Sequence, residues 1–123
     1  MIPDKHIELI KKLHAKTVNG NLGWETTANP FLYITAFPSY AITIEEKRKT
    51  KETEPDNIDI VNVYFYILKI SDHEGNVIDV IDEEELKEYQ SKYKSSLKEI
   101  FDGARRKARD VEHAVDALLS ALG

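Results

Sequence analysis

The order of apolar and polar residues divides the 123-residue chain into an N-terminal helix, a group of strands and a C-terminal helical region. In the first segment, apolar or small residues recur every three or four positions, which is typical of one buried helical face. These residues are Ile7, Ile10, Leu13 and Thr17. Asp4 is expected to cap the start of this helix, and Gly20 follows its end, where a left-handed residue is favoured.

The stretch from Asn19 to Phe31 reads NGNLGWETTANPF and contains two glycines and the only tryptophan. A glycine-rich phosphate loop follows a strand and opens a helix. Here the glycines follow a helix, and no Gly-Lys-Ser or Gly-Lys-Thr sequence is present. The pattern therefore predicts a corner between a helix and a sheet rather than a ligand-binding loop.

The middle of the chain predicts an antiparallel β-meander of four to five strands. The segments are 22–28, 31–37, 40–46, 58–70 and 77–81. Segment 40–46 alternates apolar and polar residues, as a half-buried strand does. Gly75 suits a hairpin before the last strand because it tolerates a positive φ angle. Residues 46–57 are almost all polar and mostly charged, which predicts a solvated loop.

Segment 58–70 is the strongest strand signal and is largely apolar on both faces. One face carries Val61, Val63, Phe65 and Ile67, and the other carries Tyr64, Tyr66, Leu68 and Ile70. We expect a central strand whose second face is covered, and a homodimer would cover it. Tyr64 and Tyr66 are therefore candidates for an interaction surface.

A stripe of apolar or small residues keeps helical phase through the C-terminal region. Its members are Leu86, Tyr89, Tyr93, Leu97, Ile100, Ala104, Ala108, Val111, Val115, Leu118 and Leu122. One unbroken helix would measure roughly 55 Å, in a domain whose radius of gyration should be about 14 Å. The helix is expected either to break or to pack its far end on a partner. The candidate breaks are Asp102–Gly103 and Arg109–Asp110, and the second is favoured because ARRKA is helix-forming.

Composition narrows the possible functions. The chain has no cysteine, which removes thiol catalysis and cysteine-bound metals and fits a reducing compartment. It has neither a long apolar run nor the apolar core of a secretory signal, so we expect a cytoplasmic protein with no membrane segment. A net charge of −5 argues against a general nucleic-acid binder without excluding one.

No catalytic constellation rises above chance in this sequence. The histidines are His6, His14, His73 and His113, and none lies three or four residues from another. The many carboxylates are explained by helix caps, such as Asp82, and by solvated faces. We therefore expect no catalytic residue, no metal and no cofactor.

Two local features are candidate binding residues. Arg105, Arg106 and Arg109 form a basic cluster that could contact a partner or nucleic acid, or could pair with neighbouring acids. Trp24 could belong to an aromatic platform, or it could be part of the core. Both alternatives remain open at this point for each feature.

The chain also resembles a group of small uncharacterised bacterial proteins. The resemblance rests on a helix ending in Gly-x-Leu-x-Trp (GNLGW), on the hairpin ISDHEGNVIDVI and on a terminal helix containing ARRKA. It spans nearly the whole chain and implies an α+β fold. It implies no established activity, and no catalytic residue can be carried over from it.

These observations predict one α+β domain over residues 1–123. An antiparallel meander is flanked by an N-terminal helix and by a long or broken C-terminal helical region. The function favoured is a non-enzymatic protein-interaction or regulatory module of unidentified partner. The alternatives are a nucleic-acid-binding accessory protein using the arginine cluster, and an inhibitor of a basic toxin or enzyme.

Overall fold

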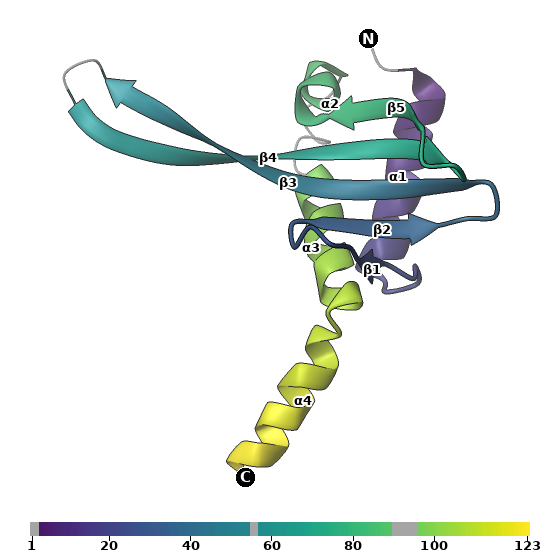
Figure 1. Cartoon of the computed structure of the whole chain (residues 1–123), viewed down its shortest axis with the longest axis vertical. Coiled ribbons are helices and arrows are strands. Elements are labelled where there is room, and N and C mark those ends of the chain that lie inside the picture. The colour runs from purple at the N-terminus through teal and green to yellow at the C-terminus, as the bar shows by residue number, and fades with distance from the viewer. Residues whose placement is uncertain (1–2, 55–56, 90–95) are drawn as a thin grey trace.

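The computed structural model describes residues 3–54, 57–89 and 96–123. It contains a five-stranded antiparallel sheet in the order β1-β2-β3-β4-β5, with helices before and after it in the chain (Figure 1). The elements are α1 (Asp4–Val18), β1 (Glu25–Thr26), β2 (Leu32–Ala36), β3 (Tyr40–Glu54), β4 (Asn57–Asp72), β5 (Val77–Asp82), α2 (Glu83–Tyr89), α3 (Ser96–Ala108) and α4 (Val111–Leu122). The predicted α+β meander is confirmed.

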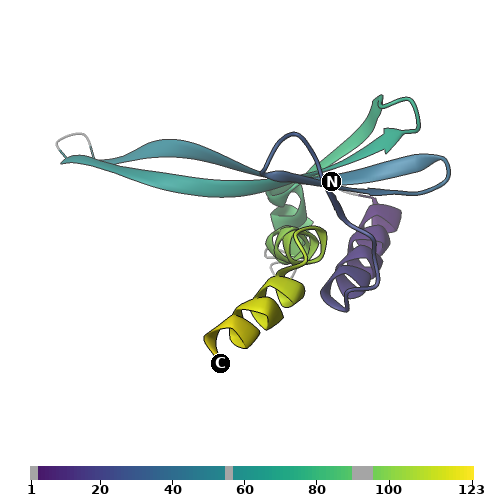
Figure 2. The ribbon, with the colours of Figure 1, turned by 60° about the horizontal axis from the view of Figure 1, so that its bottom comes forward.

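The helices lie on one side of the sheet (Figure 2). The apolar face of α1 and the first part of the C-terminal stripe pack there against alternate residues of β2 to β5. The core residues include Ile10 and Leu13 of α1, Tyr33, Ile44, Leu68 and Ile81 of the sheet, and Leu97, Ile100 and Ala104 of α3. Helix α1 ends as predicted, because Gly20 has a φ of 74°. Asp4 is the first helical residue, and the preceding Pro3 is the cap, so the prediction of an Asp4 cap is wrong.

Strands β3 and β4 are much longer than predicted. They pair from Tyr40 opposite Asp72 to Glu54 opposite Asn57, with a register shift between Glu52 and Glu54. Most of the charged stretch predicted as a solvated loop is therefore a two-stranded ribbon, and residues 55–56 of it lie outside the described part. Backbone pairing satisfies N–H and C=O groups whatever the side chains are. The charged stretch extends the ribbon beyond the part of the sheet that the helices cover (Figure 1).

Within the described residues, the predicted C-terminal stripe forms the helices α2, α3 and α4, and its member Tyr93 lies outside the described part. The favoured break at Arg109–Asp110 is confirmed: Asp110 has a φ of 51°, in the left-handed region. Its side chain makes no capping hydrogen bond. The other candidate, Gly103, lies inside α3, where a Cβ atom would approach Thr17 Cγ2 of α1 to 2.7 Å. Gly103 therefore permits a close contact between α1 and α3 and does not break the helix.

Candidate interaction surface

Helix α4 has no buried residue, although its sequence is mostly apolar. Val115 is 45% exposed, Leu118 62%, Leu119 63% and Leu122 82%. The helix extends away from the sheet and from α3, and the described residues place nothing over it (Figure 1). Large apolar side chains gathered on one exposed helix are typical of a contact surface for a partner.

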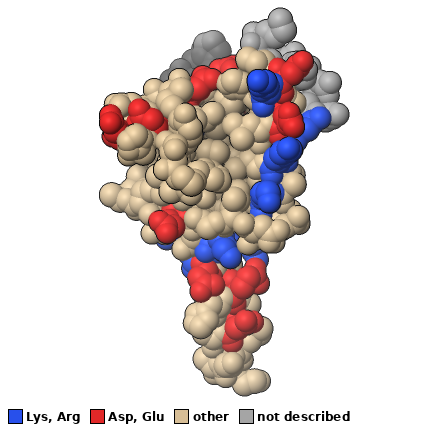
Figure 3. All heavy atoms as spheres, turned by 90° about the vertical axis from the view of Figure 1, so that its right-hand side faces the viewer, with Lys and Arg blue, Asp and Glu red and all other residues tan. Residues whose placement is uncertain are grey.

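The charges of α4 are confined to its first half. Glu112 and Asp116 are acidic, and the helix contains no lysine or arginine. Figure 3 shows this distribution, with acidic groups near the start of the projecting helix and an uncharged far end. A helix of twelve residues is marginally stable in water by itself, so α4 is expected to gain stability from a contact with another surface.

A hollow of about 370 Å³ lies beside the start of α4. The ends of α1 and α3 form it together with the junction that follows α3. The lining residues include Val18, Gly20, Arg106, Lys107 and Glu112. Val18 is exposed, so the hollow has an apolar contact point next to basic side chains.

The arginine cluster is divided between different contacts. Arg106 forms an ion pair with Glu112. Arg109 donates from Nε to the Tyr33 hydroxyl at 2.6 Å and from a terminal nitrogen to the Pro30 carbonyl at 3.1 Å. Its guanidinium also lies 5.7 Å from the centre of the Tyr33 ring. Two of the three arginines therefore hold parts of the chain together instead of forming an unpaired basic stripe.

Trp24 lies in the core and not in a binding platform. The residue is 3% exposed and comes just before β1. Its indole N–H donates to Thr17 Oγ1 at 3.1 Å. The alternative left open by the sequence is thus resolved in favour of packing, since a side chain this buried presents almost no surface to a ligand.

The two candidate tyrosines of β4 differ in exposure. Tyr64 is exposed, whereas Tyr66 is buried and its ring centre lies 5.4 Å from that of Phe101. The Tyr66 hydroxyl donates to Glu46 Oε2 at 2.8 Å. Burial, and then this hydrogen bond to a carboxylate, raises the pKa of Tyr66 above its ordinary value. The Tyr66 hydroxyl therefore keeps its proton at physiological pH, and the residue has a structural role.

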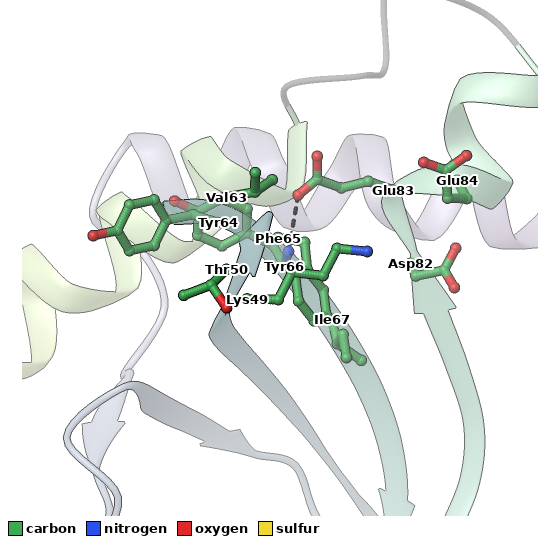
Figure 4. Close-up of a pocket in the computed structure, with 10 residues that line it drawn as sticks. All are labelled: Lys49, Thr50, Val63, Tyr64, Phe65, Tyr66, Ile67, Asp82, Glu83 and Glu84. Atoms are coloured by element: carbon green, nitrogen blue, oxygen red, sulfur yellow. Dashed lines mark hydrogen bonds between the residues drawn. The ribbon is translucent and has the colours of Figure 1, made fainter. Parts of the chain in front are cut away.

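A second hollow opens at β4, beyond the end of β5 (Figure 4). Its volume is about 730 Å³, and its lining includes Lys49, Tyr64, Phe65, Asp82 and Glu84. The dashed line in Figure 4 marks the bond from the Tyr66 backbone N–H to Glu83 Oε1, 2.8 Å long. Within the part of the chain that the structure describes, no group of three histidines or carboxylates could hold a metal ion.

The sheet face opposite the helices is also apolar in part. Leu32, Ile34, Phe65 and Ile67 lie on it and are partly buried by their neighbours in the sheet. Charged residues of both signs, Glu45, Lys69 and Asp82, lie among them. The prediction that the second face of 58–70 is covered is not met by the described residues of one chain.

Comparisons with known proteins found no match for the chain. No protein-family model, no curated protein and no solved structure matches the chain. The resemblance to a bacterial group therefore stays a prediction. Among the described residues, no helix is both long and apolar enough to cross a membrane.

The apolar stripe is evident in the sequence, but its exposed members were not among the predicted interaction residues. Val115, Leu118 and Leu122 continue the phase of Ile100 and Ala104, which are buried. Periodicity is the same for a buried and an exposed face, so it could not separate them. The length of the stripe was the informative signal, because a stripe longer than its domain predicts either a break in the helix or a far end that packs on a partner.

Proposed function

We propose that this protein is a non-enzymatic protein-interaction or regulatory module, and that α4 is the element that contacts the partner. The observation that carries the proposal is that a mostly apolar helix has no buried residue. Fully burying a leucine or valine side chain contributes about 1.5–3 kcal/mol. Docking α4 would therefore both stabilise a short helix and supply the affinity of the contact.

The proposed partner is a second copy of the chain, giving a homodimer. The exposed apolar helix needs a cover that the described residues of one chain do not supply. An inhibitor of a basic toxin or enzyme is a version of the same proposal, supported by the two carboxylates of α4. The proposed location is the cytoplasm, which the cysteine-free sequence supports.

The nucleic-acid alternative has less support. It required Arg105, Arg106 and Arg109 to present one basic surface, but Arg106 pairs with Glu112 and Arg109 bonds to β2 and the loop before it. A face that neutralises phosphates needs cations that are not already engaged with the protein. The contacts of these two arginines instead favour a structural role.

The test is light scattering coupled to size exclusion on the full chain and on two matched variants. Leu118→Lys/Leu122→Lys places two charges on the exposed apolar side of α4. Ala117→Lys/Ser120→Lys adds the same charge to other positions of the same helix. We expect the parent chain and the second variant to associate and the first to be monomeric. Equal association of all three proteins would refute the role of α4.

A further inference from the structure

We propose that two copies associate through an antiparallel pair of α4 helices, with the far end of each helix seated beside the start of the other. This inference rests on the proposed function, because it assigns both the partner and the geometry of the α4 contact. The contact surface is the α4 seam, defined here as Val111, Val115, Leu118 and Leu122.

The spacing of the α4 seam is compatible with an antiparallel pair. Its steps are four, three and four residues, as in the a and d positions of a two-helix coiled coil. The spacing is the same in both directions, so reversing the second helix preserves all four layers. Val111 then meets Leu122 of the partner subunit, and Val115 meets the partner's Leu118.

The side-chain sizes point the same way. In an antiparallel pair every layer combines a valine with a leucine, so the layers have equal volume and the helix axes stay at a constant distance. A parallel pair would place two valines in each layer near the start and two leucines in each layer near the end. The helices would then have to diverge along their length.

Charge separates the two orientations further. Glu112 and Asp116 lie in the first half of α4, and the second half is uncharged. A parallel pair would place the four carboxylates of the two helices at the same end of the dimer. The antiparallel pair sets them beside the uncharged half of the partner and also opposes the two helix dipoles.

The charge near the start of α4 complements the end of a partner helix. The last turn of α4 contains no basic residue, so the carbonyl groups there have no cation from their own helix. Arg105, Arg106 and Lys107 form the last turn of α3, next to the start of α4. Of these, Lys107 lines the hollow beside the start of α4, and in the antiparallel pair it would face the negative end of the partner's helix, where cations are stabilising.

The α4 seam alone is too small for a stable dimer. A specific interface buries about 800 Å² per partner, and an aliphatic side chain buries less than the roughly 200 Å² of an aromatic one. Four partly exposed side chains fall short of that area. The partner's helix end, seated in the hollow of about 370 Å³ beside the start of α4, would add a second contact, which twofold symmetry would repeat.

Disulfide trapping tests the orientation, because the chain has no cysteine of its own. Val111→Cys and Leu122→Cys variants of the full chain are mixed and incubated until their subunits have exchanged. They are then oxidised with a mild thiol–disulfide couple. The antiparallel pair predicts a heterodisulfide between the two variants at several times the yield of either homodisulfide. A Ser120→Cys variant, on the opposite side of α4 from the seam, controls for random collision and should cross-link poorly.

Each outcome has a separate meaning. Homodisulfides in excess of the heterodisulfide would show a parallel pair and overturn the inference. Association that depends on Leu118 and Leu122 without specific cross-linking would place α4 elsewhere, such as on the open sheet face, and would also overturn it. Both results leave the proposed role of α4 intact. That role fails only if the Leu118→Lys/Leu122→Lys variant associates as the parent does.

Discussion

At the scale of single residues, the contact between α1 and α3 depends on Thr17. Its hydroxyl accepts a hydrogen bond from the buried indole N–H of Trp24. Its methyl group lies close to the position that a Cβ atom on Gly103 would occupy. One side chain therefore satisfies a polar group and sets the distance between two helices. Both functions can be tested separately because they involve different atoms.

Thr17→Val removes the acceptor and keeps the shape. We expect the free energy of unfolding to fall by about 1–3 kcal/mol, because the buried indole N–H of Trp24 is left without a partner. Urea denaturation followed by tryptophan fluorescence measures this. Thr26→Val, at an exposed position of β1, is the control and should change stability by less than about 0.5 kcal/mol. Equal effects of the two variants would contradict the assigned hydrogen bond.

Gly103→Ala tests the close approach. The new Cβ would lie 2.7 Å from Thr17 Cγ2 and 3.3 Å from the Thr17 carbonyl oxygen. Alanine favours a helix by about 1 kcal/mol over glycine, but overpacking typically costs about 1–3 kcal/mol. We expect a net loss of stability. In the double variant, Thr17→Ser removes Cγ2 and should recover part of the loss. Strictly additive effects would argue against the contact.

At the scale of elements, α1 is attached to its neighbours by two histidine–carboxylate contacts. His6 Nε2 lies 2.6 Å from Asp79 Oδ2 of β5, and His14 Nε2 lies 2.6 Å from Glu99 Oε2 of α3. The hydrogen bond from His6, and then one from the Val80 backbone N–H, lowers the pKa of Asp79 below its ordinary value of 3.8. The stability of this contact therefore depends on pH.

The direction of that dependence follows from the lowered pKa. A carboxyl group whose pKa is lower in the folded chain contributes stability above its unfolded pKa, and this contribution is lost as pH falls through the folded value. We expect Asp79→Asn to flatten the decline of the melting temperature below about pH 4. Thermal melts from pH 6 to pH 2.5 measure it, and Asp116→Asn on α4 should follow the parent curve. Asp72, whose pKa is also lowered, maintains part of the decline in every variant.

Helix α4 should be dispensable for the stability of the remaining fold. Because none of its residues is buried, a chain ending at Asp110 should unfold within about 0.5 kcal/mol of the parent under dilute, monomeric conditions. Urea titrations at low and high protein concentration make the comparison. A large loss at low concentration would mean that α4 packs on its own chain.

The elements also show which features the sequence could predict. The buried faces of α1 and α3 followed from periodicity. A break followed from the length of the stripe, and its place at Arg109–Asp110 followed from the helix-forming ARRKA segment before it. The ribbon of β3 and β4 was not predicted, since strand pairing of charged residues such as Lys47 and Lys49 leaves no mark in the hydrophobic pattern. The exposed state of Leu118 could not be predicted either, because exposure depends on what lies opposite in space.

At the scale of the whole molecule, a homodimer formed through α4 and binding to a nucleic acid would respond differently to salt. Burial of apolar side chains is little affected by ionic screening, whereas binding to phosphates weakens steeply as salt rises. We expect the dissociation constant of the homodimer to change by less than about tenfold between 0.1 and 0.5 M NaCl, a range over which Debye screening is already strong. Sedimentation equilibrium measures it. A larger weakening would favour ionic contacts over the α4 seam.

The left-handed conformation of Asp110 has a geometric consequence for any assembly built on α4. Only Arg109 and Asp110 separate α3 from α4, so the backbone angles of this short junction set the direction of α4. One residue inserted before Val111 would turn the apolar side of α4 by about 100° about its axis. The helix could still find a partner, but the two sheets would face in new directions. In such an assembly, the relative placement of the two sheets would thus depend on the backbone angles at Arg109 and Asp110.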